Sequence, residues 1–265
     1  MNFLAELRSK IAGNRERPPR ESSTGIAHCR VFAIGDIHGR LDLLENMIAL
    51  IEERCRLDAE GPIVVFLGDY VDRGPDSAQV IDRLMNLPPT WRARFIGGNH
   101  EEAMEHFLAT PNEGRAWLDF GGRETAASYG CVAPESDASN AEWFAFHEAL
   151  LRAVPERHRR FLWGLEGHVA LGDFLFVHAG VDPDKPLSSQ SPHDLRWIRG
   201  KFLQNRRWLG KVIVHGHTPS RAPHSDDIRI GIDTWGYKTG RLTALELRGA
   251  ERSFLQTEAP GAADQ

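Results

Sequence analysis

Five short segments of this 265-residue sequence combine glycine with side chains that bind metal ions or transfer protons. In the first segment Asp36 and His38 are two residues apart and flanked by glycines, so both side chains can face one ion. A single Gly-Asp or His-Gly pair is usually a turn, but five such segments, each after an apolar run, are hard to explain by turn formation alone. They therefore predict a metal site. The segments are Gly35–Arg40, Gly68–Gly74, Gly97–Glu101, Val177–Gly180 and His215–Pro219.

Each segment follows a stretch that we expect to be a β-strand. The run Ile63–Leu67 is rich in β-branched residues and is typical of a parallel strand buried on both faces. Helical spacing of apolar residues predicts helices from Leu41 to about Leu57, from Ser77 to about Leu87, and from about His100. This alternation indicates an α/β fold, in which ligands lie beyond the carboxyl ends of the strands. The other expected strands are Arg30–Ile34, Arg92–Gly97, His168–Leu171, Phe174–His178, Lys211–His215, Ile228–Ile232 and Leu242–Leu247.

The remaining stretches differ in composition from this core. Residues 110–165 are rich in Trp, Phe, Glu and Ala without strand-like runs, and they predict a helical insertion. Residues 1–29 have adjacent prolines and a Ser-Ser-Thr-Gly run, which indicate an N-terminal extension or linker. Residues 249–265 lose periodicity, so we expect a C-terminal tail. Residues 30–248 are left as the main domain.

Composition excludes several classes of protein. With 41% hydrophobic residues and a net charge of −5, the chain is neither disordered nor a nucleic-acid binder that works by bulk positive charge. Cys29, Cys55 and Cys131 form no C-x-x-C pair, which argues against a disulfide scaffold or a thiolate zinc site. No apolar run is long enough to span a membrane, and charges interrupt the first twelve residues, unlike a signal peptide. We therefore expect a cytoplasmic protein without nucleic-acid or membrane partners.

The ordered motifs GDIHGR, GDYVDRGPDS, GNHE, HAG and HGHT resemble those of the calcineurin-like metallophosphoesterases. More narrowly, they resemble the phosphoprotein phosphatase branch with its bacterial and phage serine/threonine phosphatases. The resemblance extends from Arg30 to about Leu247 and implies a four-layer β-sandwich flanked by helices, in agreement with the α/β pattern above. Further matches are Gly121–Thr125, Ser128–Gly130, Trp197–Arg199 and Ile232–Thr234.

The resemblance also implies two divalent metal ions. A carboxylate such as Asp69 can share its two oxygens between cations, and the amide of Asn99 adds a ligand without adding charge. Few anionic ligands leave the cluster positive, so that it attracts a phosphate dianion. Oxygen and nitrogen ligands without thiolate suit Mn²⁺ foremost, with Fe or Zn²⁺ as alternatives, better than Ca²⁺. The implied ligands are Asp36 and His38 for the first ion, Asn99, His178 and His217 for the second, and Asp69 for both.

Four further residues would carry the reaction. A hydroxide that bridges the two metals is expected to attack phosphorus directly. His100 would protonate the leaving alkoxide, and Asp72 would orient His100 and raise its pKa. Arg73 and Arg199 would bind the phosphate oxygens, for which a planar guanidinium is well shaped.

Several neighbours of these residues have competing interpretations. Arg196 is the alternative to Arg199 as the second phosphate ligand. His215 is expected at the strand end beside the site, because the resembling motif makes His217 the ligand. We expect Glu101 in the first turn of its helix, where an acid is favourable.

The expected function is hydrolysis of phosphoserine or phosphothreonine in proteins. Symmetric hydrolysis of diadenosine tetraphosphate and small-molecule phosphatase activity are the alternatives. Retention of both Asp72 and Arg73 favours the protein phosphatase, because the nucleotide enzymes tend to depart from that motif. A different class of explanation is an inactive metal-binding scaffold, and the presence of all six expected ligands and His100 argues against it.

Overall fold

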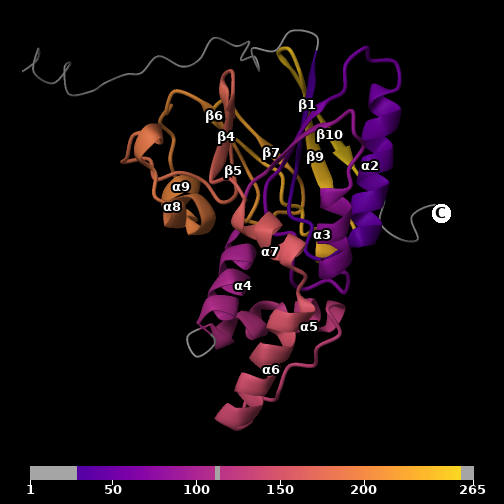
Figure 1. Cartoon of the computed structure of the whole chain (residues 1–265). Coiled ribbons are helices and arrows are strands. Elements are labelled where there is room, and N and C mark those ends of the chain that lie inside the picture. Colours follow the sequence, from indigo (N-terminus) through magenta and orange to yellow (C-terminus); the bar gives the residue numbers. More distant parts are fainter. Residues whose placement is uncertain (1–28, 111–113, 258–265) are drawn as a thin grey trace, which may run out of the picture.

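The computed structural model of the chain describes residues 29–110 and 114–257 and contains two five-stranded mixed sheets (Figure 1). The strands are β1 Arg30–Ile34, β2 Ile63–Phe66, β3 Arg92–Phe95, β4 His168–Leu171, β5 Phe174–Val177, β6 Val212–His215, β7 His224–Ser225, β8 Arg229–Gly231, β9 Thr243–Arg248 and β10 Glu251–Gln256.

The two sheets share a pattern of parallel strands with antiparallel neighbours. The first sheet has the order β10-β9-β1-β2-β3, with β1, β2 and β3 parallel and β9 and β10 antiparallel. The second has the order β4-β5-β6-β8-β7, with β5, β6 and β8 parallel and the edge strands β4 and β7 antiparallel. The carboxyl ends of the parallel strands within each sheet consequently lie at one edge of that sheet.

Helices cover the outer face of each sheet and one end of the molecule. In Figure 1, α2 and α3 lie beside the first sheet, α8 and α9 lie on the opposite side beside the second, and α4 to α7 extend beyond the strands. The helices are α2 Leu41–Cys55, α3 Ser77–Met85, α4 Asn99–Ala109, α5 Gly122–Ser128, α6 Asn140–Ala153, α7 Glu156–Trp163, α8 Pro192–Trp197, α9 Gly200–Leu203 and α10 Gly236–Thr239, with 3₁₀ turns η1 Arg115–Phe120 and η2 Leu187–Ser189.

Side chains that alternate between the two faces of each strand explain how the sheets and helices pack in layers. In β1, Val31 and Ala33 pack with residues of the second sheet such as Phe176, whereas Phe32 and Ile34 face α2 and α3. In the second sheet, the alternate strand residues pack against α8 and α9. Because successive strand residues point to opposite faces, apolar runs such as Ile63–Phe66 bury both sides. The expected four-layer sandwich is confirmed.

The insertion expected at 110–165 is helical in its described part. It comprises η1, α5, α6 and α7, whose apolar side chains form a cluster of their own with residues of α3 and α4. This cluster places Trp117 and Thr125 against the Gly68–Gly74 segment, where both contact Asp72.

Two strands were not expected from the sequence. Residues 251–256 form β10 rather than an irregular tail, because a turn at Gly249 (φ 61°) lets them pair along the whole of β9. The short strand β7 forms by pairing with β8. Cross-strand hydrogen bonds stabilise both strands. Segments of six residues or fewer have too little hydrophobic periodicity to be predicted from the sequence. The expected N-terminal extension lies almost wholly outside the described residues. Among the helices of the described ranges, none combines the length and the apolar composition of a membrane span.

Candidate metal centre

Four of the five predicted segments line a cavity of about 190 Å³ beyond the carboxyl ends of the strands, and His178 of the Val177–Gly180 segment contacts Asn99 and His217, which line it. β1 leads to Asp36 and His38, β2 leads to Asp69, and Asn99 begins α4 after β3. His217 follows β6 and reaches the same cavity from the second sheet. The lining residues are Asp36, His38, Asp69, Arg73, Asn99, His100, Arg199, His217, Pro219, Asp233, Trp235 and Tyr237.

The backbone at this cavity is unusual. In the described part of the chain, every non-glycine residue with a positive φ lines the cavity or contacts a residue that does. Such a conformation costs on the order of 1 kcal/mol per residue and persists only where surrounding contacts enforce it. The fold therefore holds these loops in place for the site. The residues are His38 (φ 49°), Asp69 (52°), Asp72 (74°), Arg73 (70°), His217 (62°) and Trp235 (62°).

Two glycines leave room for the central carboxylates. A Cβ on Gly98 would lie 2.1 Å from Asp69 Oδ1, and one on Gly216 would lie 2.1 Å from Asp36 Oδ1. Any side chain at either position would displace a carboxylate. The glycines of the third and fifth motifs are therefore required by close approach of the loops.

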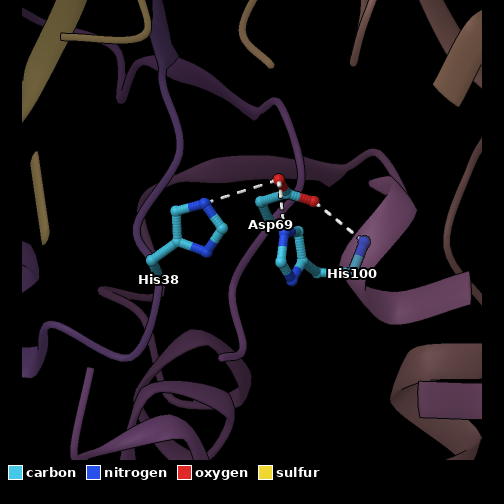
Figure 2. A group of neighbouring side chains, drawn as sticks. All are labelled: His38, Asp69 and His100. Atoms are coloured by element: carbon cyan, nitrogen blue, oxygen red, sulfur yellow. Dashed lines mark hydrogen bonds and ion pairs between the residues drawn. The ribbon is translucent and has the colours of Figure 1, made fainter. Parts of the chain in front are cut away.

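Asp69 belongs to two groups of side chains whose ligand atoms lie close together. The first group, His38, Asp69 and His100, is drawn in Figure 2. Asp69 Oδ2 is 3.5 Å from His38 Nε2, and its Oδ1 accepts a hydrogen bond from the His100 backbone N–H at 3.1 Å. His38 Nδ1 donates to the Val71 carbonyl at 3.0 Å, which leaves the Nε2 lone pair facing the cavity.

The second group consists of Asp69, Asn99, His178 and His217. His178 Nδ1 donates to the carbonyl of Leu67 at 2.9 Å, so its Nε2 has a lone pair. That Nε2 lies 2.9 Å from Asn99 Oδ1, 3.1 Å from His217 Nδ1 and 3.4 Å from Asp69 Oδ1.

These separations test whether the residues fit a metal ion. Lone pairs that face one another are unfavourable unless a cation lies between them. Ligands about 2.1 Å from a cation, in adjacent octahedral positions, are about 3 Å apart, close to the measured separations. The donor set therefore fits divalent metal ions.

The protonation of the site agrees with metal binding. Burial lowers the pKa of His38 to about 3 and that of His217 to about 2, and it also lowers the pKa of His178. All three imidazoles are thus neutral, the form that binds metals. Burial, together with the nearby carboxylates of Asp233 and Asp69, raises the pKa of Asp36 well above its usual value. Such an accumulation of buried acids favours a cation.

His100 differs from these histidines. Its Nδ1 is 2.6 Å from Asp72 Oδ2, and the carboxylates of Asp69 and Asp72 outweigh burial and raise the pKa of His100. Asp72 is fully buried, and Trp117 Nε1 donates to it at 2.9 Å and Thr125 Oγ1 at 2.7 Å. His100 Nε2 is 3.9 Å from Asp69 Oδ2, near enough for a ligand by distance alone. Its contact with Asp72 and its raised pKa instead favour a proton donor.

Both expected phosphate ligands lie at the cavity. Arg73 and Arg199 are exposed residues that line it. Arg196 instead pairs with Glu102 at 3.3 Å, which makes it the less suitable alternative to Arg199. His215 is buried in β6 beneath the loop, with its ring edge against Phe202 rather than in the cavity.

Sequence reasoning missed three contributions to the site. Glu101 was expected only to favour its helix start, but its carboxylate accepts hydrogen bonds from the backbone N–H groups of Asp69, Tyr70, Val71 and Gly98 at 2.7–3.2 Å. Four donors favour the ionised form, whereas burial and Asp69 oppose it and leave the pKa of Glu101 raised to about 7.

The other two contributions come from the segment after β8, which includes α10. Asp233 is buried at the cavity, and burial raises its pKa to about 6. Trp235 and Tyr237 also line the cavity. The Ile232–Thr234 motif had indicated similarity here, but without suggesting a role for Asp233 or for the two aromatic residues.

Comparison with known proteins agrees with this geometry. Bis(5'-nucleosyl)-tetraphosphatase PrpE [asymmetrical] of Anoxybacillus flavithermus is 25% identical over 253 residues, which cover 88% of this chain and 96% of that protein. Serine/threonine-protein phosphatase 1 of Salmonella typhimurium is 26% identical over 230 residues, covering 82% and 92%. A crystal structure of a candidate diadenosine tetraphosphatase superposes with a TM-score of 0.59 at 18% identity, covering 90% of this chain and 99% of that one, and supports the fold.

The family described as calcineurin-like phosphoesterase matches residues 29–248, most of the chain and all of the polar loops. This chain therefore belongs to the calcineurin-like phosphoesterase family.

Proposed function

We propose that the chain is a metal-dependent phosphomonoesterase that hydrolyses phosphoserine and phosphothreonine in proteins. The observation that carries this proposal is the contact between His100 Nδ1 and Asp72 Oδ2 at 2.6 Å beside the cavity. A histidine that a buried carboxylate keeps protonated can protonate a strongly basic leaving group. The alkoxides of serine and threonine are such leaving groups.

We further propose that two divalent ions, Mn²⁺ in the first place, occupy the cavity. Asp36 and His38 would hold one ion, Asn99 and His178 with His217 the other, and Asp69 both. When bound, such a pair lowers the pKa of a water molecule and offsets the charge of the phosphate. Fe and Zn²⁺ suit the same donors.

The protein's own residues would bind the phosphate and move the proton. Arg73 and Arg199 line the cavity and would contact phosphate oxygens. His100 Nε2 is turned towards the cavity, because Nδ1 is held by Asp72. It would donate its proton to the oxygen of the leaving serine or threonine.

A second candidate is hydrolysis of dinucleoside tetraphosphates. Several relatives of this chain, including those from Anoxybacillus flavithermus and Bacillus subtilis, have that name. A phosphate leaving group is less basic than an alkoxide, so the reaction would depend less on His100. The two candidates therefore differ in how much the general acid contributes.

A panel of substrates with the Mn²⁺-loaded protein tests the proposal. It contains phosphoserine, phosphothreonine and phosphotyrosine peptides, diadenosine tetraphosphate, an aryl phosphate and a phosphodiester. We expect the phosphoserine and phosphothreonine peptides to have the highest kcat/KM. His100→Asn should retain its metals and lose about 10²–10⁴ in turnover on them, with a smaller loss on the aryl phosphate. A preference for diadenosine tetraphosphate would establish the second candidate, and metal binding without any turnover would support an inactive scaffold.

A further inference from the structure

The phenol of Tyr237 has an unusual set of partners. Its oxygen is 2.7 Å from Arg73 Nη1 and 3.0 Å from Trp235 Nε1. A guanidinium N–H and an indole N–H can only donate hydrogen bonds. The Tyr237 oxygen is therefore the acceptor in both contacts, and both of its lone pairs are used.

The proton of the same hydroxyl must then point elsewhere. No acceptor for it is found in the part of the chain that the structure describes. Tyr237 lines the metal cavity together with Arg73, and its ring lies edge-on to the ring of His38 at 5.2 Å between centroids. Its acceptor is therefore water or a group on a substrate that enters the cavity.

The surrounding contacts fix the phenol in this place. The guanidinium of Arg73 lies 4.9 Å from the centroid of the Tyr237 ring, so ring and hydroxyl bind the same arginine. Arg40, at the end of the Gly35–Arg40 segment, donates to the Tyr237 carbonyl at 3.1 Å and thereby connects α10 to that segment. Trp235, held by a bond from its backbone N–H to Asp233 at 2.9 Å, directs its indole N–H at the phenol.

We propose that Tyr237 is a substrate-binding residue whose hydroxyl donates a hydrogen bond to a phosphate oxygen, while Arg73 and Trp235 orient that hydroxyl. The inference rests on the proposed phosphoester hydrolysis at this cavity and adds a neutral donor to the two arginines. A neutral donor contributes a directed hydrogen bond without adding a further positive charge beside the metals. It would therefore help to place the phosphate without retaining the product too strongly.

Calorimetric titration of the Mn²⁺-loaded full-length protein with inorganic phosphate tests the proposal without requiring turnover. Tyr237→Phe keeps the ring and removes only the hydroxyl, so we expect about tenfold weaker phosphate binding with unchanged metal content. Tyr129→Phe is the matched control, because it removes a tyrosine hydroxyl that contacts His158 away from the cavity. It should bind phosphate as the wild type does.

Combination with Arg73→Ala separates direct binding from support of the arginine. If Tyr237 contacts phosphate, Tyr237→Phe still weakens binding in the Arg73→Ala background, by a smaller factor because Arg73 no longer orients the hydroxyl. Wild-type affinity in Tyr237→Phe, or a loss that disappears in that background, would overturn the proposal. Normal phosphate binding without hydrolysis of any phosphoester would instead overturn the proposed function and leave the role of Tyr237 standing.

Discussion

Replacement of Asp72 by Asn removes the charge of the proposed general-acid pair with little change in shape. Asp72 accepts hydrogen bonds from Thr125 Oγ1 at 2.7 Å and from Trp117 Nε1 at 2.9 Å. Trp117 Nε1 and His100 Nδ1 both contact Oδ2, so the Asn amide should keep its oxygen there and place its NH₂ towards Thr125, whose hydroxyl can also accept. His100 Nδ1 then donates to a neutral amide oxygen in place of a carboxylate, which stabilises the imidazolium less.

The size of the effect follows from the loss of the negative charge. A hydrogen bond to a charged group contributes about 1.5–3 kcal/mol, and about 1.4 kcal/mol corresponds to one pKa unit. The carboxylates raise the pKa of His100, so the substitution should lower it by about one to two units. The alkaline limb of kcat should move to lower pH by the same amount. Above both pKa values, turnover should fall about 10–100-fold, and below both the difference should shrink.

The assay is kcat against pH for a phosphoserine peptide and for an aryl phosphate, with metal content measured for each preparation. The loss should be smaller for the aryl phosphate, whose leaving group needs less protonation. Asp82→Asn is a matched control, because Asp82 contacts His158 Nε2 at 2.9 Å in a second Asp–His pair outside the cavity. An alkaline limb that stays in place, or equal losses for both substrates, would refute the assignment of His100 and Asp72.

Two further substitutions test the shared metal ligand and the residue that holds the loops around it. Asp69→Asn should abolish tight binding of two metal ions, because an amide offers only one oxygen to the two ligand groups; two retained ions after dialysis, measured by elemental analysis, would contradict the shared ligand. Glu101→Gln should lower the free energy of unfolding by about 2–5 kcal/mol, because its NH₂ would face two backbone N–H groups and leave them without an acceptor. Urea denaturation measures this loss, and an unchanged midpoint would show that Glu101 does not hold the loops.

The strands and the first ligands could be predicted because their signals are local. An apolar β-branched run such as Ile63–Phe66 buries both faces of a strand, and a glycine-flanked polar turn can only follow it at the sheet edge. The placement of Asp36, His38 and Asp69 at one edge follows from the parallel order of the strands. The strand β10 could not be predicted, because it depends on pairing with β9 rather than on a pattern of its own.

The sequence by itself therefore determined the ordered loops, the oxygen and nitrogen ligands they contain, and the α/β frame that gathers them. Only the tertiary structure decided which distant groups complete the site. Trp117 of the helical insertion holds Asp72, and Tyr237 contacts Arg73 across 164 positions of sequence. The physical reason is that ligand chemistry depends on residue type and local turns, whereas the orientation of a proton donor depends on side chains that meet only after the insertion and both sheets have packed.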